Sequence, residues 1–401
     1  MVNFKFKDLF FNKLHKIDLK LDNISKKLSF YAINPINVET EKKKFFENIN
    51  YNPIFKYSEY KENLKEIRNE LKEIKTNNTI IGKILEEIKQ NYIDKTYLLQ
   101  YRKDNVKFTK YSKKIYGSPN KKLLNEAKKF MHIKFKKETE IYTSKQVVNK
   151  FKFAFLKYGF PWNVKEKEMV SKAAVNTNKM TIYIKKDMKF SENFLKRLIV
   201  HEIGTHVARF ENGKMQPYLF FKRGLLGYLK TEEGLAVYNE EINDCLNDYI
   251  LKIYAGRVIA IDFALKYSFR ETYENLRKYF NKDTAFRLTL RAKRGLGDTT
   301  KAGACTKDIN YLKGYILIKK FIKNGNNLNK LYYGKIGIEH VELIEKIPNL
   351  FNPKILPIFR HLNYITEHFS RLLKSIVDFP LISIKNINNK LTHNKSTKNN
   401  P

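Results

Sequence analysis

The segment RLIVHEIGTHVARFENG, residues 197–213, places two histidines and a glutamate in an otherwise apolar run. Its centre, residues 201–206, reads H-E-I-G-T-H. In the pattern H-E-x-x-H, two histidines on one helix face bind zinc and the glutamate acts as a general base. Here one more residue separates the histidines, so the local helix geometry decides whether they can share a metal.

A regular α-helix would turn the imidazoles of His201 and His206 about 140° apart, too far for one metal. A single π-turn takes up one extra residue and brings both rings to one face. Gly204, a poor helix former between the histidines, is the expected place for it. The alternative is a regular helix with one histidine in the core and one at the surface. Burying such groups without a role is costly, which favours the distorted helix.

The residues around this helix predict an α+β fold in which helix predominates. Ser191 is the expected N-cap and Asn212-Gly213 the expected end of the long helix. The alternating stretch MTIYIKK (180–186) predicts a strand, with the preceding segment as its hairpin partner. We therefore expect a small antiparallel sheet beside the histidine-bearing helix, within a bundle of other helices.

Periodicity and capping residues predict further helices along the chain. Two amphipathic helices are expected in 61–90, where Leu64, Ile67, Leu71 and Ile74 have helical spacing. One helix is expected from Ser144 to Gly159 and another from Thr231. Apolar helices are expected in 248–267 and 311–325, with a loop at 291–308 between them. We expect a helical N-terminal flank (1–140) packed on a catalytic domain (141–378). The polar segment 379–401 is expected to be a disordered tail.

The composition is strongly basic, with a formal net charge of +37 over 401 residues. The lysines are dispersed among acids, as in KENLKEIRNELKEIK (61–75), so no specific nucleic-acid partner is expected. Two cysteines cannot form a disulfide framework and suit a reducing compartment. The sequence shows neither a secretory apolar core nor a stretch of about 20 apolar residues for a membrane span. A cytoplasmic protein is expected.

A catalytic zinc site needs a third protein ligand. Candidates are the acids of KTEEGLAVYNEE (230–241), where a helix is expected to begin just after Thr231. Glu233 lies 27 residues beyond the second histidine. Glu232 and Glu233 lie about 100° apart on a helix, so only one of them can face the metal. Alternatively, both acids only favour the positive end of that helix.

With these residues assembled, the sequence resembles the DUF1704 family of tyrosine carboxypeptidase-like metallopeptidases. This family includes the microtubule-associated tyrosine carboxypeptidases (MATCAP) and bacterial proteins named for a QEGLA motif. The resemblance rests on HEIGTHVARFENG (201–213), TEEGLAVYNEE (231–241) and RAKRGLGDTTKAGACTKDINYLKG (291–314), with a weaker stretch at 33–57. It covers most of the chain and implies a zincin-like metallopeptidase core.

The resemblance implies one Zn²⁺ ion per chain, held by His201, His206 and Glu233, with Glu202 as the general base. It favours Glu233 because this acid directly precedes Gly-Leu-Ala. The chain departs from the bacterial motif at Glu232, where that motif has glutamine. The implied activity is that of a zinc carboxypeptidase that releases C-terminal residues, tyrosine or other aromatic residues among them, from a peptide or protein.

Other residues have less defined expected roles. Candidates for binding the terminal carboxylate are Arg209, Arg291, Arg294 and Lys307, which are otherwise ordinary surface bases. Candidates for orienting a ligand imidazole are Asp298, Asp308, Glu240 and Glu241. The strand MTIYIKK is a candidate edge strand for pairing with an extended substrate.

Two alternative functions belong to other classes. The first is a regulatory or binding protein that keeps the metallopeptidase fold and uses the metal structurally. Glu202 argues against it, since a structural site needs no general base. The second is a basic nucleic-acid-binding protein, which lacks any recognisable reading motif.

Overall fold

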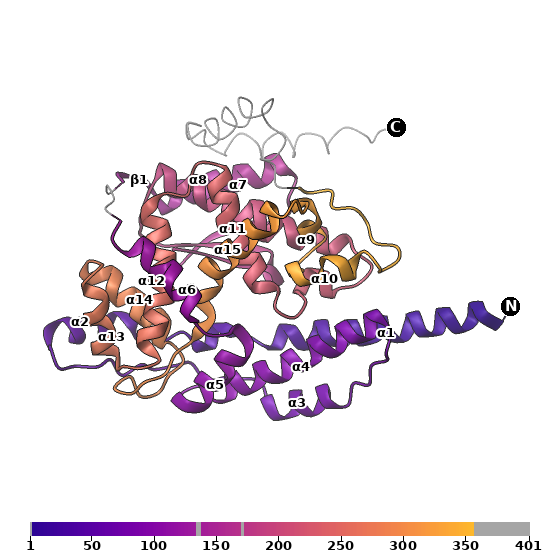
Figure 1. Ribbon diagram of the computed structural model, residues 1–401, viewed down its shortest axis with the longest axis horizontal. Helices are drawn as coiled ribbons and strands as arrows, with labels where there is room; N and C mark the ends of the chain where they lie inside the picture. The colour runs from indigo at the N-terminus through magenta and orange to yellow at the C-terminus, as the bar shows by residue number, and fades with distance from the viewer. Residues whose placement is uncertain (1, 134–137, 170–171, 357–401) are drawn as a thin grey trace, which may run out of the picture.

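The structure, a computed structural model, describes residues 2–133, 138–169 and 172–356. The expected tail at 379–401 lies outside these residues. The described chain is predominantly helical with two small sheets, as an α+β fold requires (Figure 1). Within the described ranges, every helix is too short or too polar to cross a membrane.

The N-terminal part is entirely helical. Its elements are α1 (Val2–Lys27), η1 (Phe30–Ile33), α2 (Val38–Glu47), α3 (Leu64–Lys72), α4 (Ile80–Gln100), α5 (Asn105–Tyr116) and α6 (Lys121–Met131). Helices α1, α3, α4 and α5 lie along one side of the molecule in Figure 1. The predicted amphipathic pattern is confirmed, because Ile67 and Leu71 are buried and Ile74 follows them into the same apolar cluster.

The strands form two sheets. They are β1 (Glu140–Thr143), β2 (Asn163–Lys167), β3 (Ala173–Asn176), β4 (Thr181–Lys185) and β5 (Lys189–Ser191), with the short helix η2 (Thr177–Lys179) between β3 and β4. β1 pairs with β5 in antiparallel fashion, and the other sheet has the order β2-β4-β3. The expected hairpin is confirmed, since β3 runs antiparallel to β4 with Val175 opposite Ile182.

Two expectations about the strands are wrong. The larger sheet is mixed, because β2 runs parallel to β4. The chain reverses between β2 and β3 and again between β3 and β4, so the first and last strands share a direction. The stretch MTIYIKK forms β4, which lies in the centre of the sheet, and β3 lies at its edge. The two edges of this sheet are therefore β2 and β3.

Helix α7 (Ser144–Tyr158) packs on the sheet beside the histidine-bearing helix. Its N-cap is Thr143, one residue before the expected position, and Thr143 forms a reciprocal capping box with Gln146. The helix ends as expected at Gly159, which adopts a left-handed conformation with φ of +67°.

The long helix comprises α8 (Glu192–His201), η3 (Glu202–Val207) and α9 (Ala208–Met215). Ser191 caps it as expected, accepting a hydrogen bond from the backbone N–H of Phe194. The helix continues past Asn212-Gly213, contrary to expectation. Gly213 instead allows close packing, because an added Cβ would lie 2.5 Å from the backbone oxygen of Phe221.

The C-terminal half is helical. Its elements are α10 (Phe220–Arg223), α11 (Tyr228–Ile242), α12 (Asp248–Ala264), α13 (Phe269–Arg277), α14 (Lys282–Lys293), η4 (Thr306–Ile309), α15 (Asn310–Lys323), η5 (Leu328–Tyr332), η6 (Ile338–His340) and α16 (Val341–Ile344). Helix α11 begins three residues before the expected Thr231, directly after Gly227 with φ of +74°. It crosses α15 closely, since a Cβ on Gly234 would lie 2.1 Å from the carbonyl carbon of Gly314.

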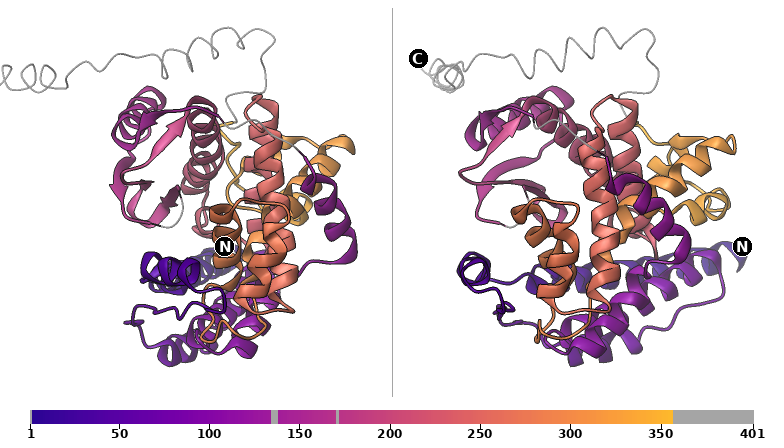
Figure 2. Two further views of the ribbon diagram at one scale, coloured as in Figure 1. Left: turned by 90° about the vertical axis from the view of Figure 1, so that its left-hand side faces the viewer. Right: turned by 60° about the vertical axis from the view of Figure 1, so that its left-hand side comes forward.

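Three apolar clusters hold these layers together. One joins α7, the strands and the long helix, including Phe151, Ile182, Ile199 and Ile203. In Figure 2 the magenta strands lie to one side of the orange helices, and the indigo N-terminal helix lies below them. The other two clusters contain residues from both the N-terminal flank and the C-terminal helices. The domain boundaries at 140 and 378 stay a prediction.

Candidate metal centre and its cavity

The helix distortion expected between the histidines is present. Residues Glu202–Val207 form a π-helix with regular α-helix on both sides. The side chain of Tyr332 donates a hydrogen bond of 2.9 Å to the carbonyl oxygen of Gly204 inside this segment. Asn239 supports the same region, donating to the hydroxyl oxygens of Tyr332 at 2.8 Å and Thr205 at 2.7 Å. Buried groups thus satisfy backbone and side-chain atoms at the bulge.

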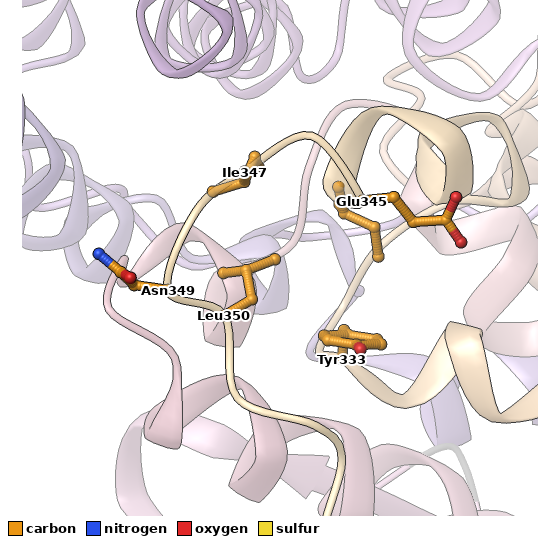
Figure 3. A pocket seen from close by; sticks show the side chains of 6 residues that line it. Tyr333, Glu345, Ile347, Asn349 and Leu350 are labelled. Carbon is orange, nitrogen blue, oxygen red and sulfur yellow. The ribbon is translucent and has the colours of Figure 1, made fainter.

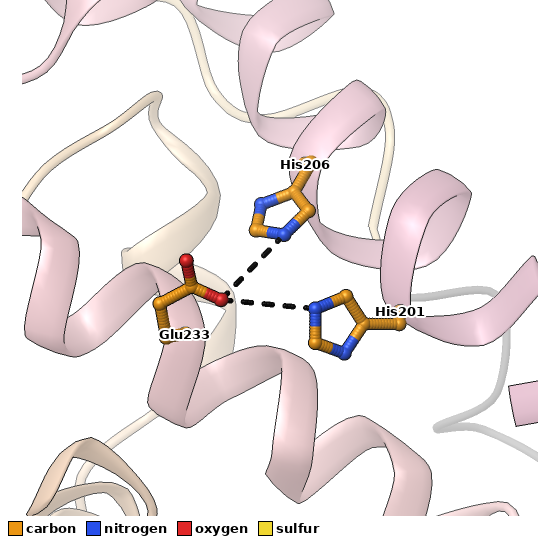
Figure 4. A group of neighbouring side chains, drawn as sticks. All are labelled: His201, His206 and Glu233. Atoms are coloured by element: carbon orange, nitrogen blue, oxygen red, sulfur yellow. Dashed lines mark ion pairs between the residues drawn. The ribbon is translucent and has the colours of Figure 1, made fainter. Parts of the chain in front are cut away.

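The π-turn places both imidazoles toward one carboxylate. Nε2 of His201 lies 3.7 Å and Nε2 of His206 lies 3.9 Å from Oε2 of Glu233. Figure 4 shows the two rings on one helix and the carboxylate on another, with all three directed at a common point. One donor atom from each residue falls within 4.8 Å of the others. The structure therefore brings the three expected ligands together.

The other ring nitrogens of both histidines are bound to carboxylates. Nδ1 of His201 donates to Glu240 at 2.6 Å, and Nδ1 of His206 donates to Glu232 at 2.9 Å. Such carboxylate–histidine pairs fix the tautomer and orient the ring. Each Nε2 is left as the nitrogen that faces Glu233.

Glu240 is fully buried at the centre of a polar network. It also accepts hydrogen bonds from Arg197 at 3.1 Å and from the hydroxyl of Tyr254 at 2.9 Å. Burial would raise the pKa of Glu240, but the charge of Arg197 and the contact with His201 outweigh burial and lower it. Of the four acids considered from the sequence, Glu240 is the one that orients a ligand imidazole.

The remaining three candidates have other contacts. Asp308 pairs with Arg291 and Arg294. Glu241 pairs with Lys319 at 2.7 Å. Asp298 accepts from the backbone N–H of Thr300 at 2.9 Å. Asp308 is buried and is held by two arginines, whereas Glu241 and Asp298 are partly exposed; each has its contacts with groups other than the two imidazoles.

Glu232 is the functional residue that the sequence reasoning passed over. It is 1% exposed and lies between His206 and two cations. Its Oε1 is 3.0 Å from Nζ of Lys335, and its Oε2 forms an ion pair with Arg209. Burial would raise the pKa of Glu232, yet Lys335 and Arg209 hold it far below its usual value. The signal was the first acid of TEEGLA, but only the fold shows that the 100° step between neighbours directs Glu232 at Nδ1 of His206 while Glu233 faces Nε2 of both histidines.

Glu202 lies on the π-helix next to the donor cluster. It is buried, lines the cavity, and its Oε2 is 3.9 Å from Nε2 of His206. This position, beside the point faced by both imidazoles, is what a general base acting on a water molecule there requires.

The electrostatics of the cluster favour a cation at its centre. Burial would lower the pKa of His201, but the carboxylates of Glu233 and Glu240 raise it to about 10. Burial would likewise raise the pKa of Glu233, but His201 and His206 lower it to about 2. The pocket thus stabilises positive charge strongly, and a bound cation would compete with the proton on the imidazole.

The residues present fit a zinc ion. Oε2 of Glu233 is buried and, among the described residues, has no hydrogen-bond partner. A buried carboxylate oxygen without a donor is costly, and it lies where two imidazole nitrogens also point. Two histidines and one glutamate are a donor set of catalytic zinc sites, which keep a further position open.

A cavity of about 1260 Å³ adjoins the cluster. Of the four basic residues considered for substrate binding, Arg291, Arg294 and Lys307 line it. Arg209, the fourth candidate, is absent from the cavity lining. Its side chain is fully buried, and each of its three nitrogens donates to Glu232 or to the backbone carbonyls of 331, 334 and 336, which disfavours direct contact with a substrate.

A smaller hollow of about 260 Å³ lies between η5 and the end of α16 (Figure 3). Its lining includes Tyr333, Glu345 and Leu350 and lacks a histidine, a cysteine or an arginine. Among the described residues, the group that could hold a metal ion lies at the larger cavity and not at this hollow.

Comparison with known proteins shows similarity over most of the chain. Residues 43–376 match the model of a family described as microtubule-associated tyrosine carboxypeptidase. A mouse protein named "Putative tyrosine carboxypeptidase MATCAP2" is 25% identical over 372 residues, covering 88% of this chain and 63% of the relative. The human "Microtubule-associated tyrosine carboxypeptidase 1" is 29% identical over 167 residues, covering 40% and 35%. The chain thus spans less than two thirds of these relatives. Since the family model covers most of its length, the chain belongs to the microtubule-associated tyrosine carboxypeptidase family.

Proposed function

We propose that this protein is a zinc-dependent carboxypeptidase, with a zincin-like core, that releases residues from the C-terminus of a peptide or protein. The observation that supports it best is the buried, unpartnered Oε2 of Glu233, faced by Nε2 of both His201 and His206. These three residues would hold the ion. When bound, zinc supplies Lewis acidity, polarising the substrate carbonyl and lowering the pKa of water to about 7.

The chain's own residues provide the proton transfers and the orientation. Glu202 accepts the proton of the attacking water and donates it to the leaving amine, so the carboxylate is regenerated in each cycle. Glu240 and Glu232 hold the imidazoles with Nε2 directed at the site. Since Glu232 is itself held by buried cations, it can keep the imidazole of His206 in this orientation.

The shape of the cavity supports an extended peptide substrate. All four residues of β3, Ala173–Asn176, line it. As an edge strand of its sheet that also lines the cavity, β3 can pair with a substrate backbone in the role first assigned to β4. The relatives are named tyrosine carboxypeptidases, and we extend to this chain a preference for a C-terminal tyrosine or another aromatic residue.

The compartment is part of the proposal. Cys245 and Cys305 are both buried and carry free thiols. Free buried cysteines suit a reducing environment, which supports the cytoplasm as the place of action.

The test combines metal analysis with digestion of a peptide library read by mass spectrometry. We expect one zinc per chain and products shortened from the C-terminus. Glu202→Gln should retain zinc and lose activity by about 10²-fold or more, because it removes the proton acceptor. Glu241→Gln, on the partly exposed side of α11, is the matched control and should keep parental activity.

Each outcome discriminates between functions. A parent protein without stoichiometric zinc overturns the metalloenzyme proposal. Stoichiometric zinc without hydrolysis supports the binding-protein alternative. Cleavage within peptides, with intact C-termini in the products, overturns the carboxypeptidase assignment. Activity retained in Glu202→Gln removes Glu202 from its role.

A further inference from the structure

The wall of the cavity contributed by α12, α14 and η4 is basic. Its cationic side chains are Arg257, Arg287, Arg291, Arg294 and Lys307. Asp308, which lies in η4, forms ion pairs with Arg291 and Arg294 of this group. An excess of buried positive charge is unfavourable unless an anion neutralises it. The wall therefore has the character of an anion site.

Two of the arginines already have a partner. Asp308 accepts from Nε of Arg291 and, at 2.9 Å, from Nη2 of Arg294. Burial would raise the pKa of Asp308, but the surrounding arginines hold it far below its usual value. Arg291 and Arg294 are thus held by one shared carboxylate, which reduces their capacity to recognise a ligand.

Within the described part of the chain, Arg257 has two buried nitrogens without a hydrogen-bond acceptor, whereas Arg294 has one, its Nε, and is held by Asp308 through Nη2. The two nitrogens of Arg257 are Nε and Nη1. Unpaired buried N–H donors of a charged group are strongly unfavourable, so an acceptor is missing from this position. The side chain is not free to move toward solvent, because its guanidinium stacks 4.0 Å from the ring centroid of Tyr311 and 5.0 Å from that of Tyr254.

The stack connects Arg257 to the metal centre. The ring of Tyr311 lies nearly parallel to the imidazole of His201, with centroids 6.3 Å apart and planes at 20°. Burial would lower the pKa of Arg257, but Tyr311 and Asp308 raise it, with a smaller contribution from Glu233. The orphaned guanidinium therefore lies in the same cavity as the expected ligands, beyond one aromatic ring.

We propose that Arg257 binds the C-terminal carboxylate of the substrate, with Lys307 supplying a second positive charge. This inference rests on the proposed function, since it names the group that positions a peptide end beside the catalytic centre. A planar guanidinium matches a carboxylate and donates charge-assisted hydrogen bonds to it. Lys307 lines the same wall and its Nζ adds long-range attraction without a fixed geometry.

The role differs from that expected of Arg291 and Arg294. Those residues shape the wall through Asp308, and Arg257 contacts the substrate. A carboxylate held on Arg257 would satisfy its orphaned donors and neutralise part of the excess charge. A C-terminal amide offers one oxygen and no charge, so it would leave the wall unneutralised.

The experiment measures binding without turnover. In full-length, zinc-loaded Glu202→Gln protein, calorimetry compares an N-acetylated peptide ending in a free carboxylate with the same peptide ending in an amide. We expect the acid to bind about tenfold or more tightly than the amide. Adding Arg257→Gln should reduce this ratio to near one, and Arg257→Lys should restore part of it. Arg277→Gln, an exposed arginine outside the cavity lining, is the matched control and should keep the full ratio.

The outcomes separate this inference from the proposed function. Equal binding of acid and amide by the parental site overturns the inference even if peptides are hydrolysed, and it needs no Arg257 variant to fold. A ratio that persists in folded Arg257→Gln also overturns it, while leaving carboxypeptidase activity in place. A ratio that depends on Arg257 in a protein without hydrolysis supports the subsite and overturns the proposed activity.

Discussion

Replacing Glu232 by glutamine tests whether this residue supports the metal centre. Glutamine has the same shape and keeps an oxygen that can accept from Nδ1 of His206, so the change removes charge and little else. The loss leaves Arg209, which is fully buried, and Lys335, 3.0 Å away, without their shared counter-charge. Removing one partner of a buried ion pair typically costs about 3–5 kcal/mol.

This cost sets the size of the expected effect. For a chain of 401 residues, it corresponds to a fall in Tm on the order of 5 °C. Zinc affinity should fall by about tenfold, at the low end for residues that orient a ligand, because the hydrogen bond to the imidazole survives. The effect on stability should therefore exceed the effect on metal binding.

The assay is urea unfolding of the apoprotein together with zinc titration against a competing chelator. Glu241→Gln, on the same helix, loses a partly exposed ion pair and should change the unfolding free energy by less than about 1 kcal/mol. A double variant, Glu232→Gln with Lys335→Met, should recover part of the loss, because it removes one uncompensated cation. If Glu232→Gln and Glu241→Gln unfold alike, the reasoning about this network is refuted.

Three further predictions follow from close contacts. Gly234→Ala forces a Cβ into the backbone of Gly314, so thermal melting should show a loss of about 1–3 kcal/mol or more. Tyr332→Phe removes the hydroxyl that donates to the carbonyl oxygen of Gly204. It should lower the free energy of unfolding by about 1–3 kcal/mol and weaken zinc binding. Unchanged zinc affinity would show that the π-turn needs no such support. Arg209→Lys should lower the free energy of unfolding by about 1–3 kcal/mol, because the variant loses donors to three backbone carbonyls. The KM for peptides should stay unchanged. A raised KM in a variant of full stability would support a role of Arg209 in substrate binding.

Local features could be predicted where short-range geometry leaves few solutions. Five-residue spacing in H-E-x-x-x-H admits a shared face only with a π-turn, and that turn is present at Glu202–Val207. Capping chemistry located Ser191 and Gly159 correctly because both act within one turn. Where a residue serves long-range packing, the same rules failed: Gly213 looked like a helix end but accommodates the backbone of Phe221.

The sequence by itself determined the histidine pair, the distortion between them and, through the family resemblance, Glu233 as their companion. These depend on helix periodicity and on a compact motif. Only the tertiary structure decided that Glu232 orients His206, that Arg209 is buried and that Nε and Nη1 of Arg257 have no hydrogen-bond acceptor within the described part of the chain. Such roles depend on which helices cross and how closely they pack. The packing decides which charged and polar partners a buried side chain contacts, and those partners determine what the side chain can bind.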